Sequence, residues 1–238
     1  MRLDTYLSEK GLCKSRAAAQ ELIKSGGVSV NGKPALKNSL DVSDGDELTL
    51  DEAKNPKYVG RGGLKLERAL ELWEISLAGK TCLDVGASTG GFTDCMLQHG
   101  AARVFAVDVG SGQLAEALRS DPRVVSLENT DIRGFDLQEP ADFIGADVSF
   151  ISQKLILPHI YRLLKTGGAA VVLIKPQFEA GKSALNKKGI VTSEKVRESC
   201  VREIQKTAEQ CGFAIIGEEK SPITGGDGNI EYLLAIKK

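Results

Sequence analysis

One glycine-rich stretch, residues 83–93 (LDVGASTGGFT), constrains the fold more than any other part of the chain. An apolar run at 81–83 is typical of the end of a buried strand, and a helix is predicted over 92–99. Glycines between a strand and a helix let a ligand approach the backbone, because glycine has no Cβ. A second apolar strand, 104–107, ends in Asp108, where a carboxylate can accept hydrogen bonds from ribose hydroxyls. The stretch therefore predicts a nucleoside-binding unit.

The residue types around the turn indicate which nucleoside suits it. Gly86-x-Ser88-x-x-Gly91 is a degraded form of the dinucleotide fingerprint, with serine at the middle glycine. Asp84 stands two residues before the first glycine, where its carboxylate would repel a pyrophosphate but suit a cationic ligand such as S-adenosylmethionine (SAM). These residues favour SAM over a dinucleotide, and a strand–helix turn that holds no ligand is the remaining alternative.

Composition indicates a globular protein with one ordinary domain and one small domain. The chain has 238 residues, of which 42% are hydrophobic and 26% are charged. No apolar run approaches the ~18 residues of a membrane span, and the N-terminus lacks the apolar core of a signal peptide. The five cysteines form no Cys-x-x-Cys pair and there are only two histidines. We therefore expect a cytoplasmic protein without membrane segments, a disulfide framework or a metal site.

The first fifty or so residues predict a small unit of two helices followed by a short sheet. Helices are expected at 2–10 and 16–25, and strands at 28–30 and 47–50. An Asn-Gly pair after the first of these strands is a strong hairpin signal. Basic residues outnumber acidic ones between residues 2 and 37, an excess that can create a basic face on a small unit.

Residues 2–33 (RLDTYLSEKGLCKSRAAAQELIKSGGVSVNGK) resemble the small RNA-binding domain named after ribosomal protein S-four. In that family the second helix and the following turn present basic residues to structured RNA. The resemblance implies RNA contacts by basic residues at the matching positions, and we add Arg61 from the segment that follows: Arg2, Lys14, Arg16, Lys24 and Arg61. A solvated charged face on a helical hairpin is the alternative. We predict an RNA-binding domain at 1–54, a linker at 55–63 and a second domain at 64–238.

The second domain alternates strands and helices, which predicts a mostly parallel seven-stranded sheet covered on both faces. This is the α/β, Rossmann-like fold, preceded by the small α+β unit. Strands are expected at 81–83, 104–107, 124–127, 143–147, 169–174, 213–218 and 230–236, and helices at 64–73, 92–99, 114–119, 153–164 and 193–210. Ligand residues should lie at the carboxyl ends of the strands, where Asp84, Asp108, Asp131, Asp147 and Lys175 fall.

Four polar residues stand where a structural role is hard to supply: Lys65, Asp147, Lys175 and Glu231. Lys65 lies near the start of a predicted helix, where a cation opposes the helix dipole. Lys175 and Asp147 end strands expected to be neighbours, and Glu231 follows the glycine-rich loop 225–228 at the start of the last strand. Two ion pairs at a sheet edge are the structural alternative.

This pattern resembles the Lys-Asp-Lys-Glu tetrad of the FtsJ-type ribose 2′-O-methyltransferases. The whole chain resembles the TlyA family, also called hemolysin A, in which an S-four-like domain precedes an FtsJ-like domain. The motifs that carry the resemblance are RGGLKL at 61–66, DVGASTGGFTD at 84–94, AVDVG at 106–110, ADVSFIS at 146–152, KPQFE at 175–179 and GNIE at 228–231.

The resemblance implies a SAM-dependent enzyme that methylates the 2′-hydroxyl of cytidines in ribosomal RNA, with rRNA or ribosomal subunits as its partner and no metal. Lys175 would be the base, as a neutral amine favoured by the neighbouring cation Lys65 and the sulfonium of SAM, while Asp147 and Glu231 orient the lysines. The implied cofactor residues are Asp84, Gly86, Ala87, Ser88, Gly90, Gly91, Phe92, Asp108, Val109, Asp131 and Ile132.

Three alternatives remain at this point. The chain could be an RNA-binding protein with an inactive methyltransferase fold, a membrane-lytic hemolysin, or a dinucleotide oxidoreductase. An intact tetrad argues against the first. The absence of a spanning segment or a strongly amphipathic basic helix argues against the second. The third leaves the RNA-binding domain unexplained. No oligomeric state is assigned from the sequence.

Overall fold

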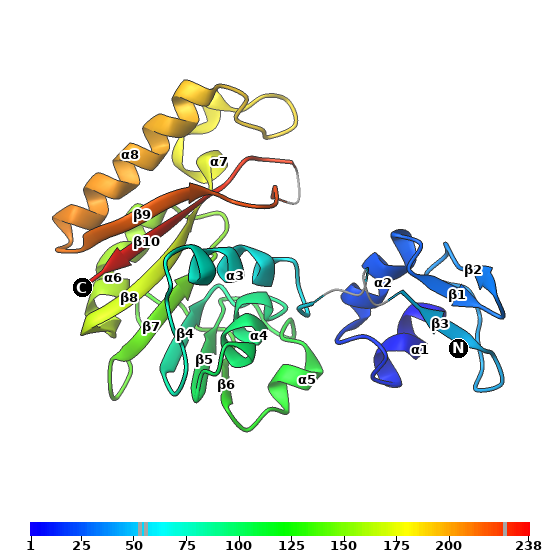
Figure 1. The fold of residues 1–238 in the computed structure, drawn as a ribbon. Helices are drawn as coiled ribbons and strands as arrows, with labels where there is room; N and C mark the ends of the chain where they lie inside the picture. Colours follow the sequence, from blue (N-terminus) through cyan, green and yellow to red (C-terminus); the bar gives the residue numbers. More distant parts are fainter. Residues whose placement is uncertain (52–53, 55–56, 226–227) are drawn as a thin grey trace.

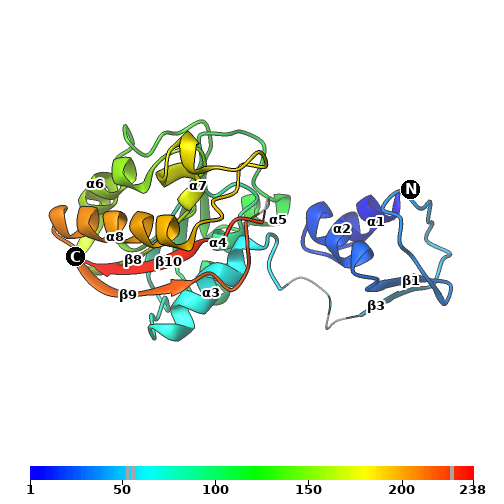
Figure 2. The same ribbon diagram turned by 90° about the horizontal axis from the view of Figure 1, so that it is seen from above.

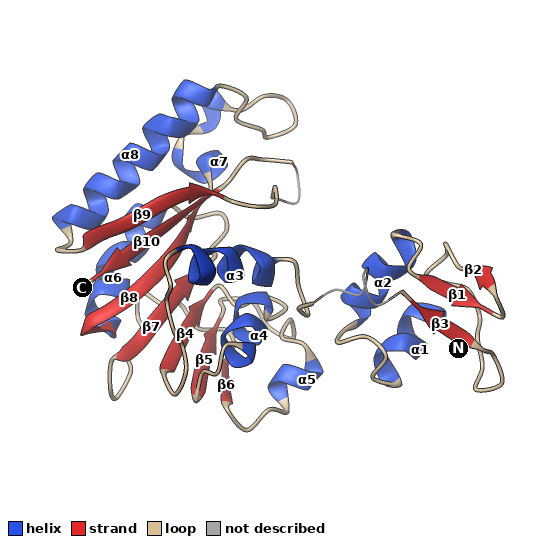
Figure 3. Ribbon diagram, viewed as in Figure 1, coloured by secondary structure: helices blue, strands red, loops and turns tan. Residues whose placement is uncertain are grey.

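Two units, each with its own β-sheet, make up the computed structural model (Figures 1 and 3). The structure describes residues 1–51, 54, 57–225 and 228–238. Residues 55–56 of the expected linker and residues 226–227 of the glycine-rich loop lie outside this described part. No helix in the described ranges is long and apolar enough to cross a membrane.

The N-terminal unit packs two helices against a three-stranded antiparallel sheet of order β2-β1-β3. Ser15 begins the second helix, because its side chain accepts a hydrogen bond from the Ala18 backbone N–H. Asn31 and Gly32 both have positive φ, at 52° and 73°, and make the predicted hairpin turn. The elements are α1 (Leu3–Glu9), α2 (Arg16–Lys24), β1 (Val28–Val30), β2 (Lys33–Pro34) and β3 (Leu48–Leu50). The short β2 was not predicted.

The larger unit contains the mostly parallel seven-stranded sheet that the sequence predicts, in the order β6-β5-β4-β7-β8-β10-β9. Among the strands of this sheet in the described ranges, β10 runs in the opposite direction to the rest and is antiparallel to its neighbours β8 and β9. The strands are β4 (Thr81–Val85), β5 (Arg103–Val107), β6 (Val124–Leu127), β7 (Ala141–Ala146), β8 (Leu164–Ile174), β9 (Ala214–Lys220) and β10 (Tyr232–Lys237). The helices are α3 (Gly62–Leu72), α4 (Gly91–Gln98), α5 (Glu116–Arg119), α6 (Gln153–Leu163), α7 (Pro176–Glu179), the 3-10 helix η1 (Lys182–Ala184) and α8 (Glu194–Gln210).

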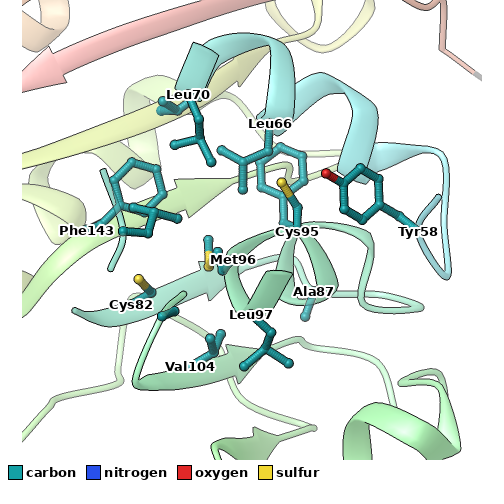
Figure 4. Packing of buried hydrophobic residues seen from close by; sticks show 14 of the residues in the cluster. Tyr58, Leu66, Leu70, Cys82, Ala87, Cys95, Met96, Leu97, Val104 and Phe143 are labelled. Carbon is teal, nitrogen blue, oxygen red and sulfur yellow. The ribbon is translucent and has the colours of Figure 1, made fainter. Parts of the chain in front are cut away.

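Helices cover both faces of this sheet, with α3 and α4 on one side and α6 and α8 on the other (Figure 2). Successive strand residues point to opposite faces, so Cys82 packs under α3 and α4 while Leu83 packs under α6 and α8. Figure 4 shows the first cluster, where Leu66 and Leu70 of α3 and Met96 of α4 meet the sheet. This two-sided burial explains why the central strands are almost continuously apolar.

The segment before α3 belongs to the core of the larger unit. Tyr58 and Val59 are each 2% exposed and pack in the α3–α4 cluster (Figure 4), although they fall within the expected linker 55–63. A Cβ on Gly63 would lie 2.3 Å from the Tyr58 ring, so only glycine lets α3 lie this close. We therefore propose that the larger unit begins at or before Tyr58.

Strand β8 begins at Leu164, five residues earlier than the predicted start at 169. Ala141 pairs with Leu164 and Phe143 with Ala169, so a register shift accommodates the extra residues of β8. The apolar run 169–174 therefore predicted only the buried part of a longer strand. The connection between β8 and α8 contains α7 and η1.

Candidate active site

The carboxyl ends of β4, β5 and β7 border a cavity of about 520 Å³. Strands β5 and β7 lie on opposite sides of β4, so the chain reverses its direction of strand addition here. Crevices of this kind are where open α/β sheets bind ligands. The predicted cofactor residues on its wall are Gly86, Ser88, Asp108, Val109, Asp131 and Ile132, together with Asp147 of the predicted tetrad.

The turn after β4 lies directly against the end of β7. Gly86 has a φ of 83°, and a Cβ there would lie 2.9 Å from the Asp147 carbonyl oxygen. The Asp147 backbone N–H donates to the Val85 carbonyl at 3.0 Å, which joins the same two segments. Glycine at position 86 therefore sets how closely the cofactor turn approaches the backbone of Asp147.

Asp108 is held rigidly at the cavity wall by two backbone donors. Ser88 N–H donates to Oδ2 and Gly110 N–H donates to Oδ1, each at 2.7 Å. A carboxylate oxygen has a second lone pair, so both oxygens can still accept hydrogen bonds from hydroxyl groups. The arrangement suits the two hydroxyls of a ribose.

The other end of the cavity combines apolar and polar side chains. Val109 is 71% exposed beside Asp108, and Ile132, although only 4% exposed, also lines the cavity. Asp131 forms an ion pair with Arg133 at 2.6 Å, and hydrogen bonds from that side chain lower the pKa of Asp131 to about 2. Apolar surface next to a fixed carboxylate fits the flat face and the amino group of adenine.

Asp84 lies behind the turn and not on the cavity surface. It is completely buried, Thr93 Oγ1 donates to its Oδ2 at 2.6 Å, and burial raises the pKa of this carboxyl to about 7. The direct contact with a cationic ligand that its sequence position suggested is not available to a side chain without exposed surface. Gly90, at the start of α4, is likewise not on the wall of the large cavity.

The structure brings the four residues of the predicted tetrad into one cluster. Lys175 Nζ lies 2.7 Å from Asp147 Oδ1. Lys65 Nζ lies 2.7 Å from Glu231 Oε2 and 3.4 Å from Asp147 Oδ2. Asp147 therefore bridges the two lysines. The first turn of α3, the ends of β7 and β8, and the residue before β10 supply the four side chains.

A reactive site must be open to a ligand, whereas a pair of structural ion pairs need not be. Lys65 and Lys175 are each 8% exposed and Glu231 is 3% exposed, as a buried structural network would also be. A smaller cavity of about 190 Å³, however, has Lys175 and Asp147 on its wall. Gly86, Ser88, Asp147 and Ser149 line both cavities, so the predicted cofactor site and the tetrad adjoin. Ala87, Gly91 and Phe92 line the smaller one.

Three residues beside the tetrad were not singled out from the sequence. Lys175 Nζ donates to Ser149 Oγ at 2.8 Å, and Gln177 Nε2 lies 3.5 Å from Glu231 Oε1. Phe150 is 91% exposed and its ring centroid lies 5.1 Å from that of Phe178. Their position within the ADVSF and KPQFE motifs was the available signal, because both motifs contain a tetrad residue.

Two of the three expected RNA-binding arginines, Arg2 and Arg16, share one buried carboxylate. Asp4 is completely buried and accepts hydrogen bonds from Arg2 Nε and Arg16 Nε at 3.0 Å and from Gln20 at 2.8 Å. The hydrogen-bonded Arg2 guanidinium holds the pKa of Asp4 well below its usual range. The side chains of Arg2 and Arg16 are still 46% and 55% exposed, so both can also reach a phosphate.

The other expected RNA-binding residues have different surroundings. Lys24 is exposed on α2. Lys14 donates to the Lys57 carbonyl and lies 3.4 Å from Asp94 Oδ2 of α4, so it joins the two units. Arg61 is exposed and lines both the smaller cavity and a separate one beneath α2. Among the described residues no group of three or more His, Cys, Asp or Glu could hold a metal ion.

The sheet, its switch-point cavity and the tetrad define a methyltransferase of the FtsJ type joined to an RNA-binding domain. Residues 58–238 match the FtsJ-like methyltransferase family, and residues 1–48 match the S4 domain. The chain is 43% identical to the 16S/23S rRNA (cytidine-2′-O)-methyltransferase TlyA of Mycobacterium tuberculosis, over 99% of this chain and 89% of that protein. It therefore belongs to the TlyA family of FtsJ-like methyltransferases.

The hemolysin name occurs within the same family. The chain is 43% identical to Hemolysin A of Brachyspira hyodysenteriae, over 98% of each protein. A solved structure from Streptococcus thermophilus that bears a hemolysin label is 41% identical, with a TM-score of 0.78 over 100% of this chain and 88% of that one. A SAM-dependent methyltransferase from Mesorhizobium loti, 16% identical, shares the fold with a TM-score of 0.57 over 75% of this chain and 100% of that one.

Proposed function

We propose that this protein transfers a methyl group from SAM to the ribose 2′-hydroxyl of a cytidine in ribosomal RNA. The single observation that carries the proposal is the Lys175–Asp147 pair on the wall of a cavity that adjoins the nucleoside-sized one. A relative named as an rRNA (cytidine-2′-O)-methyltransferase supports the substrate. Because that substrate is ribosomal RNA, we also propose that the protein acts in the cytoplasm.

The residues around the large cavity fit SAM. Asp108 would accept hydrogen bonds from the ribose hydroxyls, and Val109 and Ile132 would contact the adenine, with Asp131 near its amino group. Gly86 and Ser88 would border the methionine half, next to the tetrad. When bound, SAM supplies a methyl group on a sulfonium, which needs no further activation.

The protein's own task is to make the ribose hydroxyl nucleophilic. A hydroxyl attacks poorly until its proton leaves, and Lys175 Nζ would accept that proton as a neutral amine. Lys65 shares the Asp147 carboxylate with Lys175 and is also held by Glu231. The two carboxylates thus fix the positions of both lysine side chains in the tetrad.

Two exposed side chains near the tetrad fit an RNA substrate. Phe150 presents an exposed ring on the wall of the large cavity, next to Ser149, which lines both cavities, and aromatic rings stack on unpaired bases of RNA. Arg61 lies at the rim of the smaller cavity and can pair with a phosphate. A nucleotide whose base stacks on Phe150 would be held at the edge of the cavity that contains Lys175.

Methyl incorporation from radiolabelled SAM into ribosomal subunits from cells that lack the gene tests the proposal. We expect label in rRNA, located by mapping ribose methylation with and without the protein. Absence of incorporation, with RNA binding retained, would instead favour an RNA-binding protein with an inactive methyltransferase fold. Lysis of erythrocytes by the purified protein would favour the hemolysin alternative.

A further inference from the structure

We infer that Ser149 is a positioning residue for methyl transfer: its hydroxyl accepts the hydrogen bond that orients the Lys175 amine toward the substrate. The inference rests on the proposed function, since it gives Lys175 the role of base. Ser149 is not part of the Lys-Asp-Lys-Glu tetrad, and its hydroxyl contacts Lys175 of that tetrad.

An ion pair with Asp147 and a hydrogen bond to Ser149, both on one short segment, hold the Lys175 amine. Its Nζ lies 2.7 Å from Asp147 Oδ1 and donates to Ser149 Oγ at 2.8 Å. Asp147 and Ser149 are two residues apart in the connection between β7 and α6. The amine is therefore held from the end of β7, although Lys175 itself belongs to the end of β8.

Two hydrogen-bond acceptors are enough to fix the direction of the lone pair of a neutral amine. A neutral amine has one bond to Cε, two N–H donors and one lone pair, in a tetrahedral arrangement. When Asp147 and Ser149 each accept one N–H, the lone pair is left at the remaining position, where it can accept the hydroxyl proton. With Asp147 as the sole acceptor, rotation about the Cε–Nζ bond lets the lone pair occupy either of the two remaining positions.

The surroundings of Ser149 argue against a role in holding the fold together. Ser149 is exposed, and without its hydroxyl the buried Lys175 amine still has Asp147 Oδ1 at 2.7 Å as a charged partner. It lines both the nucleoside-sized cavity and the smaller tetrad cavity. The next residue, Phe150, has a φ of 63°, a conformation that is costly for an aromatic residue and tends to be retained at functional sites.

The test uses the full-length protein with three substitutions. Ser149→Ala removes the acceptor, Ser149→Thr keeps a hydroxyl, and Ser76→Ala removes an exposed serine hydroxyl that follows the C-terminal end of α3 and accepts from the Ala78 backbone N–H. The measurements are kcat and KM for ribosomal RNA, SAM affinity by calorimetry, and the melting temperature. Relaxation of the Lys175 Cε carbon by NMR adds a readout that needs no activity.

We expect Ser149→Ala to lower kcat by about 5- to 10-fold, the effect of removing one hydrogen bond, with KM, SAM affinity and melting temperature unchanged. Ser149→Thr should restore most of the turnover, and Ser76→Ala should match the wild type. Lys175 Cε should become more mobile only in Ser149→Ala. Wild-type kcat in Ser149→Ala, a loss confined to KM, or unchanged Lys175 mobility would each overturn the inference. A wild-type protein that methylates no rRNA would refute the proposed function, while the mobility measurement would still decide the role of Ser149.

Discussion

At the scale of single residues, the proposed chemistry depends on whether Lys175 can lose its proton. Lys175→Ala should bind SAM and RNA but lose about a hundredfold or more in turnover, because general base catalysis is typically worth that much. Lys175→Arg should be nearly as inactive, since a guanidinium stays protonated at any usable pH. Single-turnover methylation of ribosomal RNA measures both. Substantial activity in Lys175→Arg would mean that the residue supplies only positive charge.

A second prediction for a single residue concerns the effect of the Asp84 carboxyl on the free energy of unfolding. Burial raises the pKa of this carboxyl from 3.8 to about 7, so the folded protein holds its proton more tightly than the unfolded chain does. Its contribution to stability is therefore lost as pH rises from about 4 to 7. Asp84→Asn keeps an oxygen that can accept the hydrogen bond from Thr93. Because its amide does not ionise, the free energy of unfolding of this variant should lack that fall with rising pH.

Thermal and denaturant unfolding at pH 5 and pH 8 check the Asp84 prediction. Between these pH values the wild-type free energy of unfolding should fall by about 3 kcal/mol more than that of Asp84→Asn. Parallel pH dependence in the two proteins would show that Asp84 is ionised in the folded state across this range.

At the scale of elements, Glu179 joins the helix that follows Lys175 to the start of α6. Glu179 ends α7, and its carboxylate accepts hydrogen bonds from Gln153 N–H at 2.8 Å and from the Ser152 hydroxyl. A carboxylate at a helix N-terminus also has a favourable interaction with the helix dipole. The contact therefore fixes α7, whose N-cap residue is Lys175.

Glu179→Ala should lower the free energy of unfolding by about 1–2 kcal/mol, as the removal of a helix cap does, and should reduce turnover because α7 loosens. Glu179→Gln should have a milder effect, since its amide oxygen can still accept from Gln153. Glu203→Ala is the matched control: its carboxylate pairs with the neighbouring Lys154 on the surface, and such a pair is worth about 0–1 kcal/mol. Equal losses in Glu179→Ala and Glu203→Ala would contradict this role.

At the scale of the whole molecule, the two units have separate cores. The N-terminal cluster contains residues 3–50 only, and neither cluster of the larger unit contains a residue before Tyr58. The described contacts between the units are polar, such as Ser15 Oγ to the Val59 carbonyl at 3.1 Å and Lys14 to Asp94. The larger unit should therefore keep its core when the first unit is removed.

Deletion of residues 1–54 should leave SAM affinity intact and remove most of the affinity for ribosomal RNA. Basic side chains that bind phosphates release counterions, so the slope of log affinity against log salt should fall by about 1 for each phosphate-binding side chain that the deletion removes. Lys24→Ala is the matched point variant. Arg2→Ala or Arg16→Ala would also weaken the support of the buried Asp4 carboxylate. Unchanged RNA binding by the truncated protein would mean that the basic residues of the N-terminal unit face solvent and do not bind RNA.

Local sequence patterns determined most of the elements and the membership of the tetrad. Apolar runs, the glycine turn at 83–93 and the hairpin turn at Asn31-Gly32 depend on residues close in the chain, and these elements are present as predicted apart from shifts at their ends. Lys65 and Glu231 were recognisable because each stands in a motif of the family, although they are 166 positions apart in the chain.

Only the tertiary structure decided which side chains meet and which are buried. The burial of Asp84, the place of Tyr58 and Val59 in the core, the contact of Lys14 with Asp94 and the bond from Lys175 to Ser149 follow from strand order and register. These are properties of the packed molecule, because side chains far apart in the chain come together only when the sheet is assembled. A polar residue at the end of a strand can face the cavity, as Asp108 does, or lie behind it, as Asp84 does, and the local sequence is similar in the two cases.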